Sequence, residues 1–287
     1  MSKPKIYWLV SYPKSGNTWC RVFLSNYMNN EKKQISINQL DTIPVASSRF
    51  FVDTFLGLES SELTPEEIAE FRLEAFNILQ KKSKDLRIIK VHDSFPEKNE
   101  PNFFTENITA GVIYVVRNPL DITVSLACHL NVSIDCAIKN INDEHFYFCN
   151  NQDRLEIQFP QKLGSWSGHI KSWMENYKGK LHLIRYEDLL NEPHKTFKGL
   201  IDFLGLEFNE EYFLESIESS NFNLLKEQEK QNGFNEKSPK TKTFFREGKA
   251  GSWKKYLNPT QIKNIVNNHN KTMTTLNYLD KEGKLIV

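Results

Sequence analysis

The sequence predicts an α/β fold in which helices cover both faces of a parallel sheet. Four short apolar segments rich in β-forming residues carry this prediction, at residues 6–10, 87–91, 111–116 and 181–185. A polar turn follows each segment and a helical pattern follows most, which is typical of a parallel sheet wrapped by helices. The length of 287 residues suits one large α/β domain or two small ones, and we expect a single domain over 1–287.

Start and stop signals place three longer helices. Thr64 precedes Pro65 and Glu67, which together form an N-cap, a first-turn proline and a capping box, so a helix is expected from here to about Lys82. Its apolar residues recur at helical spacing and would form one face: Ile68, Phe71, Ala75 and Leu79. A second helix is expected over 164–177, and a third over 193–204 with Gly205 just beyond its end.

Two long stretches fit neither a helix nor a strand pattern. Residues 134–160 are polar, aromatic and irregular, and residues 224–245 are highly charged. Long loops within a compact domain are usually lids or other functional segments. We therefore expect two long lid loops in the single domain.

Composition narrows the range of partners. The chain has 37 basic and 36 acidic side chains, so no global field favours nucleic acid or an anionic membrane. Four cysteines, Cys20, Cys128, Cys136 and Cys149, lack zinc-binding spacing, and we expect no metal site. Cys20 and Cys128 lie in apolar helical patterns and are expected to be buried thiols. Because we find no signal-like core and no membrane-length apolar run, we expect a cytoplasmic protein.

The segment after the first expected strand is the clearest candidate for a binding site. Residues 12–19, YPKSGNTW, join that strand to an amphipathic segment. The first N–H groups of a helix are unpaired and lie at its positive end, so they can bind an anion, with Lys14 as an added charge. The position of Lys14 before the glycine differs from a Walker A loop. An ordinary turn capped by Ser15 or Thr18 explains the local pattern equally well.

Charged or titratable side chains also follow the other three strands. Lys90 and His92 end the second, Arg117 follows the third and precedes a helix with Ser125, and Tyr186 follows the fourth. Ligands of open α/β sheets bind at the carboxyl ends of the strands. The sequence therefore predicts a site for a polyanionic ligand beside a titratable imidazole.

Three motifs in order resemble those of the sulfotransferases that use 3′-phosphoadenosine-5′-phosphosulfate (PAPS), the family of the cytosolic sulfotransferases. Residues 12–19 resemble the family's 5′-phosphosulfate loop, and residues 115–125, VVRNPLDITVS, its 3′-phosphate segment. Residues 245–254, FREGKAGSWK, are similar to its C-terminal signature. Weaker similarities at 90–92, 164–166 and 185–188 follow the family's order, so the resemblance covers nearly the whole chain.

The resemblance implies a fold like that of the P-loop NTPases but without NTP hydrolysis. It also implies sulfuryl transfer from PAPS to a hydroxyl or amine of a small acceptor, without a metal. The implied catalytic residues are His92 as general base, Lys90 at the sulfonate, and Lys14 at the oxygen that bridges the 5′-phosphate and the sulfuryl group.

The resemblance implies three groups of cofactor-binding residues. Around the 5′-phosphate it places Lys14, Ser15, Gly16, Asn17 and Thr18. Along the adenosine it places Trp19, Tyr186, Ser220 and Phe222. In the two chain segments that bind the 3′-phosphate it places Arg117, Ser125, Arg246, Glu247 and Gly248.

General chemistry is consistent with these implied roles. Sulfuryl transfer resembles phosphoryl transfer, with a loose in-line transition state, so positioning and electrostatics dominate catalysis. Lys14 would stabilise the charge that develops on the leaving phosphate. A neutral imidazole, with a reference pKa of about 6.5, suits a general base near neutral pH.

The chain departs from the family pattern at several positions. Val91 stands where the family usually has threonine, Glu247 where it has lysine, and Ser252 where it has aspartate. Lys249 or Lys254 would then compensate for Glu247. The family's short dimerisation motif is not recognisable in residues 255–259, which leaves the oligomeric state open.

Two alternatives and the acceptor stay open at this point. A non-catalytic protein that binds PAP, the desulfated cofactor, is consistent with Val91 and Glu247, whereas the absence of Walker A order disfavours a nucleotide kinase. The aromatic residues of 134–160, with Phe50, Phe51 and Phe55, either wall a pocket for a small apolar alcohol or phenol or belong to the core. Near-neutral net charge disfavours a highly sulfated polysaccharide acceptor.

Overall fold

A four-stranded parallel sheet forms the centre of the computed structural model, which describes residues 3–29, 34–40, 43–151, 155–237 and 241–286. Its strands are β1 (Ile6–Ser11), β2 (Arg87–Val91), β3 (Thr109–Val116) and β6 (Leu181–Arg185), in the order β2-β1-β3-β6. All three pairings are parallel, so the four carboxyl ends lie along one edge. The predicted strands are confirmed, with β1 and β3 slightly longer than expected.

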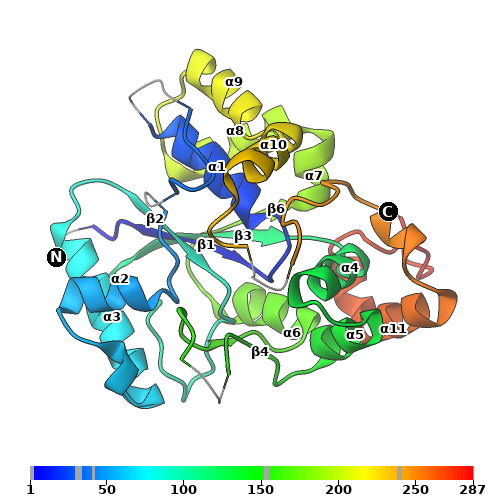
Figure 1. Cartoon of the computed structure of the whole chain (residues 1–287), viewed down its shortest axis with the longest axis horizontal. Coiled ribbons are helices and arrows are strands. Elements are labelled where there is room, and N and C mark those ends of the chain that lie inside the picture. The colour runs from blue at the N-terminus through cyan, green and yellow to red at the C-terminus, as the bar shows by residue number, and fades with distance from the viewer. Residues whose placement is uncertain (1–2, 30–33, 41–42, 152–154, 238–240, 287) are drawn as a thin grey trace.

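Helices cover both faces of this sheet, as predicted (Figure 1). One side carries α1 (Asn17–Tyr27), α8 (Pro193–Leu204), α9 (Glu210–Ser219) and α10 (Phe222–Asn232). The other side carries α2 (Arg49–Leu56), α3 (Pro65–Lys82), α4 (Pro119–Leu130), α5 (Ile134–Asn142), α6 (Trp166–Lys171) and α11 (Pro259–Thr275). The short helix α7 (Tyr186–Asn191) follows β6 directly.

Side chains of β1 alternate between two hydrophobic cores. Trp8 and Val10 pack in the core that contains Phe76 of α3, whereas Leu9 packs with Phe23 of α1 and Phe197 of α8. This alternation follows from the period of two along a strand. Burial on both faces holds β1 at the centre, and it fixes the position where the loop after β1 leaves the sheet.

The expected helix signals are confirmed. Thr64 accepts a hydrogen bond from the Glu67 backbone, and Glu67 accepts one in return, so a capping box begins α3. Helix α8 ends at Gly205, whose φ of 65° is a left-handed value that favours glycine. The expected helix over 164–177 is present as α6, which continues into a π-helical turn at Ser172–Asn176.

The expectation of two long loops was wrong in part, because each stretch contains a helix. Residues 134–142 form α5, where the Ser133 hydroxyl caps the first turn and Ala137, Ile138 and Ile141 are buried. Helix α10 buries Leu225 and Glu229 and otherwise carries mostly polar side chains. The α10 segment shows little hydrophobic periodicity and so resembles a loop in the sequence. In α5, by contrast, Ile134, Ala137, Ile138 and Ile141 recur at helical spacing, so this helix could have been predicted.

The cysteine prediction is half confirmed. Cys20 is buried in α1, but Cys128 is exposed, because it lies on the outer side of the mostly apolar helix α4. Within the described ranges we find no cluster of histidine, cysteine and carboxylate side chains suited to a metal ion. In those same ranges no single helix is long and apolar enough to cross a membrane; α4 and α5 pass that test only as a pair bent by 115°.

Candidate active site

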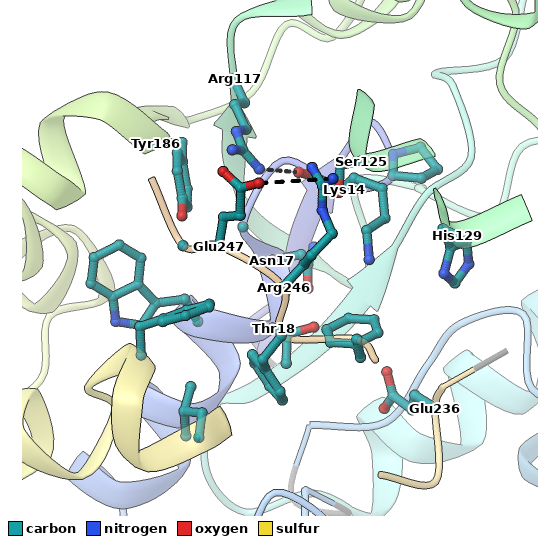
Figure 2. A pocket seen from close by; sticks show the side chains of 18 of the residues that line it. Lys14, Asn17, Thr18, Arg117, Ser125, His129, Tyr186, Glu236, Arg246 and Glu247 are labelled. Atoms are coloured by element: carbon teal, nitrogen blue, oxygen red, sulfur yellow. Dashed lines mark hydrogen bonds and ion pairs between the residues drawn. The ribbon is translucent and has the colours of Figure 1, made fainter. Parts of the chain in front are cut away.

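A cavity of about 1220 Å³, open mouth included, lies at the carboxyl edge of the sheet. Figure 2 shows Arg117 and Tyr186 on one side of it and His129 and Glu236 on the other. Nearly all predicted site residues line this cavity: Lys14, Gly16, Asn17, Thr18, Trp19, Lys90, His92, Arg117, Ser125, Tyr186, Ser220, Phe222, Arg246, Glu247 and Gly248. Residues spread over more than 230 positions of the sequence therefore meet in one site.

Two polar side chains of the loop after β1 shape the loop itself. The Ser15 hydroxyl is buried, does not line the cavity, and donates to the Tyr12 carbonyl at 2.8 Å. The Asn17 amide donates to the Leu9 carbonyl at 2.9 Å. These bonds hold the turn closed, so the loop can offer a ligand the free N–H groups of the first turn of α1 and the Lys14 side chain.

The backbone of this loop requires a glycine at position 16. Gly16 has a φ of 105°, a value that side-chain-bearing residues rarely adopt. A Cβ atom there would lie 2.6 Å from the Tyr186 ring. The absent side chain therefore lets Tyr186 close against the loop, and Trp19 packs edge-on to the same ring at 5.8 Å between centroids.

Lys14 is a cation without a carboxylate partner among the described residues. Its ammonium lies 3.8 Å from the centroid of the Phe244 ring. Burial lowers its pKa to about 7, with Lys90 and Arg117 as further causes. Such a group gains a proton readily when an anion approaches.

Arg117 joins two distant segments. Its guanidinium donates to the Lys14 carbonyl at 3.2 Å and to the Lys249 carbonyl at 2.9 Å, and it lies 4.2 Å from the centroid of the Tyr186 ring. Its Nε is buried with no hydrogen-bond partner in the described part of the chain. The guanidinium therefore still has capacity for an anionic ligand.

The C-terminal segment places a second glycine against an aromatic ring. A Cβ atom at Gly248 would lie 2.3 Å from the Phe222 ring. Glu247 accepts a hydrogen bond from the Tyr256 hydroxyl at 2.6 Å and lies 4.0 Å from Arg246. That hydrogen bond lowers the pKa of Glu247, so the carboxylate stays ionised even though it lines the cavity.

Asp121 of α4 anchors this segment. Its buried carboxylate accepts hydrogen bonds from the Gly251 and Trp253 backbones and from the Ser252 hydroxyl, at 2.8, 3.0 and 2.9 Å. Ser252 stands where the resembling family pattern has an aspartate. Here its hydroxyl donates to the carboxylate of Asp121 instead.

We expect Asp121→Ala to lower the free energy of unfolding by about 3 kcal/mol, because three buried donors lose a charged acceptor. Urea denaturation would measure the loss. The exposed Asp85→Ala is the matched control and should change the same free energy by less than about 0.5 kcal/mol. Equal effects of the two substitutions would contradict an anchoring role.

His92 is held in one tautomer. Its Nδ1 lies 2.7 Å from the Ser11 carbonyl, which can only accept, so Nδ1 carries the proton and Nε2 has a free lone pair. Burial, followed by the charge of Lys90, lowers the pKa of His92 well below 6.5. The backbone of His92 is held as well, because its carbonyl accepts from His169 Nε2 at 2.9 Å. A neutral, oriented imidazole can accept a proton from a ligand.

Several side chains at the site were not predicted from the sequence: His129, Gln158, Glu236 and Phe244. Glu236 forms ion pairs with Lys90, at 2.8 Å, and with Arg21. Lys90 and Glu236 are 146 positions apart, and no motif links them. Burial lowers the pKa of His129 to about 3, so this ring is neutral and stacks on Phe148 at 5.8 Å between centroids.

Of the two alternatives left open for the aromatic residues, pocket wall or core, the structure favours the core for most of them. Phe50 is 79 % exposed, whereas Phe51 and Phe55 pack on each other within the core. Of the aromatic residues in 134–160, Phe148 lines the cavity and Phe159 is buried in the core. Core positions and pocket walls both use aromatic side chains. The residue type alone therefore does not tell which of these phenylalanines lie in the core and which line the cavity.

Comparison with known proteins gives a consistent result across nearly the whole chain. The family model described as a sulfotransferase domain matches residues 4–277. Sulfotransferase 1B1 of Mus musculus is 27% identical over 291 residues, which cover 94% of this chain and 84% of the relative. Cytosolic sulfotransferase 8 of Arabidopsis thaliana is 26% identical, with 90% and 73% covered.

Solved structures show the same fold. Mouse sulfotransferase SULT7A1, complexed with PAP, is 21% identical with a TM-score of 0.61, and the match covers 95% of this chain and 85% of that one. Retinol dehydratase, in complex with androsterone and the inactive cofactor PAP, is 17% identical with a TM-score of 0.64 and covers 95% and 82%.

Proposed function

This chain belongs to the sulfotransferase domain family, whose cofactor is PAPS, and we propose that it transfers the sulfuryl group of PAPS to a hydroxyl or amine of a small acceptor. One observation carries this proposal. Lys14, Arg117 and Arg246 converge on one cavity with the neutral imidazole of His92. The cations alone would explain binding of any polyanion. The oriented base beside them indicates in addition a transfer reaction in which the receiving group loses a proton.

The residues that line the cavity suit an adenosine phosphorylated at both ends. Lys14 and the N–H groups that begin α1 would hold the 5′-phosphate. Arg117, whose Nε has no partner among the described atoms, would hold the 3′-phosphate together with Ser125 and Arg246. The rings of Trp19, Tyr186 and Phe222 would enclose the adenosine, and both cavity glycines already lie against two of these rings.

Each catalytic residue has a distinct role in this proposal. PAPS supplies the activated sulfuryl group. His92 accepts the acceptor proton at Nε2 while Nδ1 stays bonded to the Ser11 carbonyl. Lys14 would stabilise the negative charge that develops on the leaving phosphate, and Lys90 would bind the sulfuryl oxygens. A direct in-line transfer needs no covalent intermediate on the protein.

The acceptor would lie beside His92 in a mixed environment. Phe148 and Phe244 contribute apolar surface there, and Gln158 and the neutral His129 contribute hydrogen-bonding groups. This lining favours a small, partly apolar alcohol, phenol or amine. Retinol dehydratase structures hold retinol and androsterone, which are partly apolar alcohols. We further propose that 1–287 form one domain and that the protein is cytosolic, like the plant relatives with that name.

Transfer of labelled sulfate from PAPS to a panel of phenols, alcohols and amines tests this function. We expect a labelled product with at least one acceptor, and a metabolite extract incubated with PAPS should show gains of one sulfonate by mass spectrometry. Calorimetry with PAP serves as the parallel measurement. Binding of PAP without transfer to any acceptor would instead support a non-catalytic PAP-binding protein.

A further inference from the structure

Glu236 links two cations at the acceptor end of the cavity. Its carboxylate lies 2.8 Å from the Lys90 ammonium and also pairs with the Arg21 guanidinium of α1. Lys90 is 11 % exposed at its side chain and Arg21 is 3 % exposed. Burial opposes ionisation of Glu236, but Lys90 and Arg21 outweigh it and hold the pKa of Glu236 below its usual range.

Arg21 fixes Glu236 in place. The remaining terminal nitrogen of Arg21 donates to the Leu40 and Ile43 carbonyls, at 3.2 and 2.8 Å. In the described part of the chain Glu236 is the carboxylate that pairs with this guanidinium. Withdrawal of Glu236 would leave this buried cation without a counter-charge from the described residues, which is strongly unfavourable. Glu236 is therefore a fixed part of the site rather than a side chain that a ligand displaces.

Glu236 supports the charge of Lys90 against burial and against Arg21. Burial lowers the pKa of Lys90, and Glu236 acts against this effect, followed by the smaller influences of Arg21 and Cys149. Lys90 in turn lowers the pKa of three cavity neighbours: Lys14, His92 and His129. Glu236 is thus the principal group that keeps Lys90 cationic within a cluster of positive charge.

We infer that Glu236 is a positioning residue that holds the Lys90 ammonium at the reacting end of the cavity. An ammonium has three N–H donors, so one bond to Glu236 leaves two donors for the sulfuryl oxygens. The inference rests on the proposed function, since it assigns Glu236 a role through Lys90. It predicts that Glu236 affects transfer more than it affects binding of PAP, which lacks the sulfuryl group.

The first test compares Glu236→Gln with the exposed Glu227→Gln of α10. We expect Glu236→Gln to lower kcat about tenfold and to change the Kd of PAP by less than about twofold. Loss of the carboxylate lowers the pKa of Lys90, so the alkaline limb of the kcat profile should move to lower pH. Glu227→Gln should match the wild type, and an unchanged kcat and pH profile in Glu236→Gln would overturn the inference.

A double-mutant cycle separates positioning from a general structural role. If Glu236 acts through Lys90, adding Glu236→Gln to Lys90→Met should lower kcat by less than about twofold further. Full additivity of the two losses would overturn the inference. Glu236→Asp should recover part of the activity, and circular dichroism would verify that each variant is folded.

A measurement that needs no turnover tests the same role. The Lys90 side chain can be titrated by NMR with labelled lysine in the wild type and in Glu236→Gln or Glu236→Asp. We expect a lower Lys90 pKa in Glu236→Gln and a value near that of the wild type in Glu236→Asp. Failure of the wild type to transfer sulfate would count against the proposed function, whereas equal Lys90 titration in all three proteins would count against the role of Glu236.

Discussion

Replacement of His92 by alanine is expected to lower kcat for sulfuryl transfer about a thousandfold, which is the usual range for loss of a general base. The change removes the free Nε2 that accepts the acceptor proton in the proposed mechanism. Because His92 contacts neither phosphate of the cofactor in that mechanism, the Kd of PAP should stay within about twofold of the wild type. Labelled transfer assays and calorimetry would measure the two quantities separately.

The exposed His145 provides the matched control for this substitution. His145→Ala should leave kcat and the Kd of PAP unchanged, whereas full activity or loss of PAP binding in His92→Ala would refute the assigned role. The pH dependence offers an independent check. The pKa of His92 lies well below 6.5, so the neutral base persists at neutral pH and activity should fall only as the medium becomes distinctly acidic.

Replacement of Lys14 by alanine is expected to lower kcat/KM at least about a thousandfold, because the leaving phosphate loses the cation that stabilises it. The Kd of PAP should also rise, by about tenfold or more, since the 5′-phosphate loses a charge-assisted bond. Steady-state kinetics and calorimetry would test both effects. The exposed Lys263→Ala is the control and should alter neither quantity.

Lys14 also predicts how PAP binding depends on pH. In the ligand-free protein the pKa of Lys14 is lowered to about 7, while the bound phosphate favours the protonated form. Affinity for PAP should therefore be strongest below pH 7 and weaken as the pH rises above it. The phosphate groups themselves titrate near pH 6, so the comparison with Lys14→Ala isolates the contribution of Lys14. Identical pH dependence in both proteins would argue against this contribution.

Features that depend on neighbouring residues could be predicted from the sequence. The strands of the sheet are short apolar segments, and both faces of β1 are buried, so their pattern needs no knowledge of the tertiary structure. The position of Lys14 between β1 and α1 follows in the same way. Residues that follow parallel strands must meet at one edge, which is why Lys90, His92 and Arg117 were correctly grouped.

Features that depend on tertiary packing could not be predicted. Phe51 and Phe148 are the same residue type, and no local pattern distinguishes them, yet Phe51 lies in the core and Phe148 lines the cavity. Glu236 meets Lys90 and Arg21 only because α1, β2 and the segment after α10 converge. Cys128 is exposed although its helix is apolar on most sides. In each case the environment is set by elements far away in the chain.

The bond between Arg117 and the Lys249 carbonyl has a consequence for protein synthesis. The loop that begins the candidate nucleotide site has been translated by residue 19, whereas the last segment of the site waits for residues 245–252. At translation rates of about 5–20 residues per second, roughly ten to fifty seconds separate the two events. A nascent chain that stops before residue 245 has the loop that begins the site but lacks the segment that completes it. The complete site can therefore stabilise the newly made protein through nucleotide binding only after residues 245–252 have been made, too late to assist the earlier steps of co-translational folding.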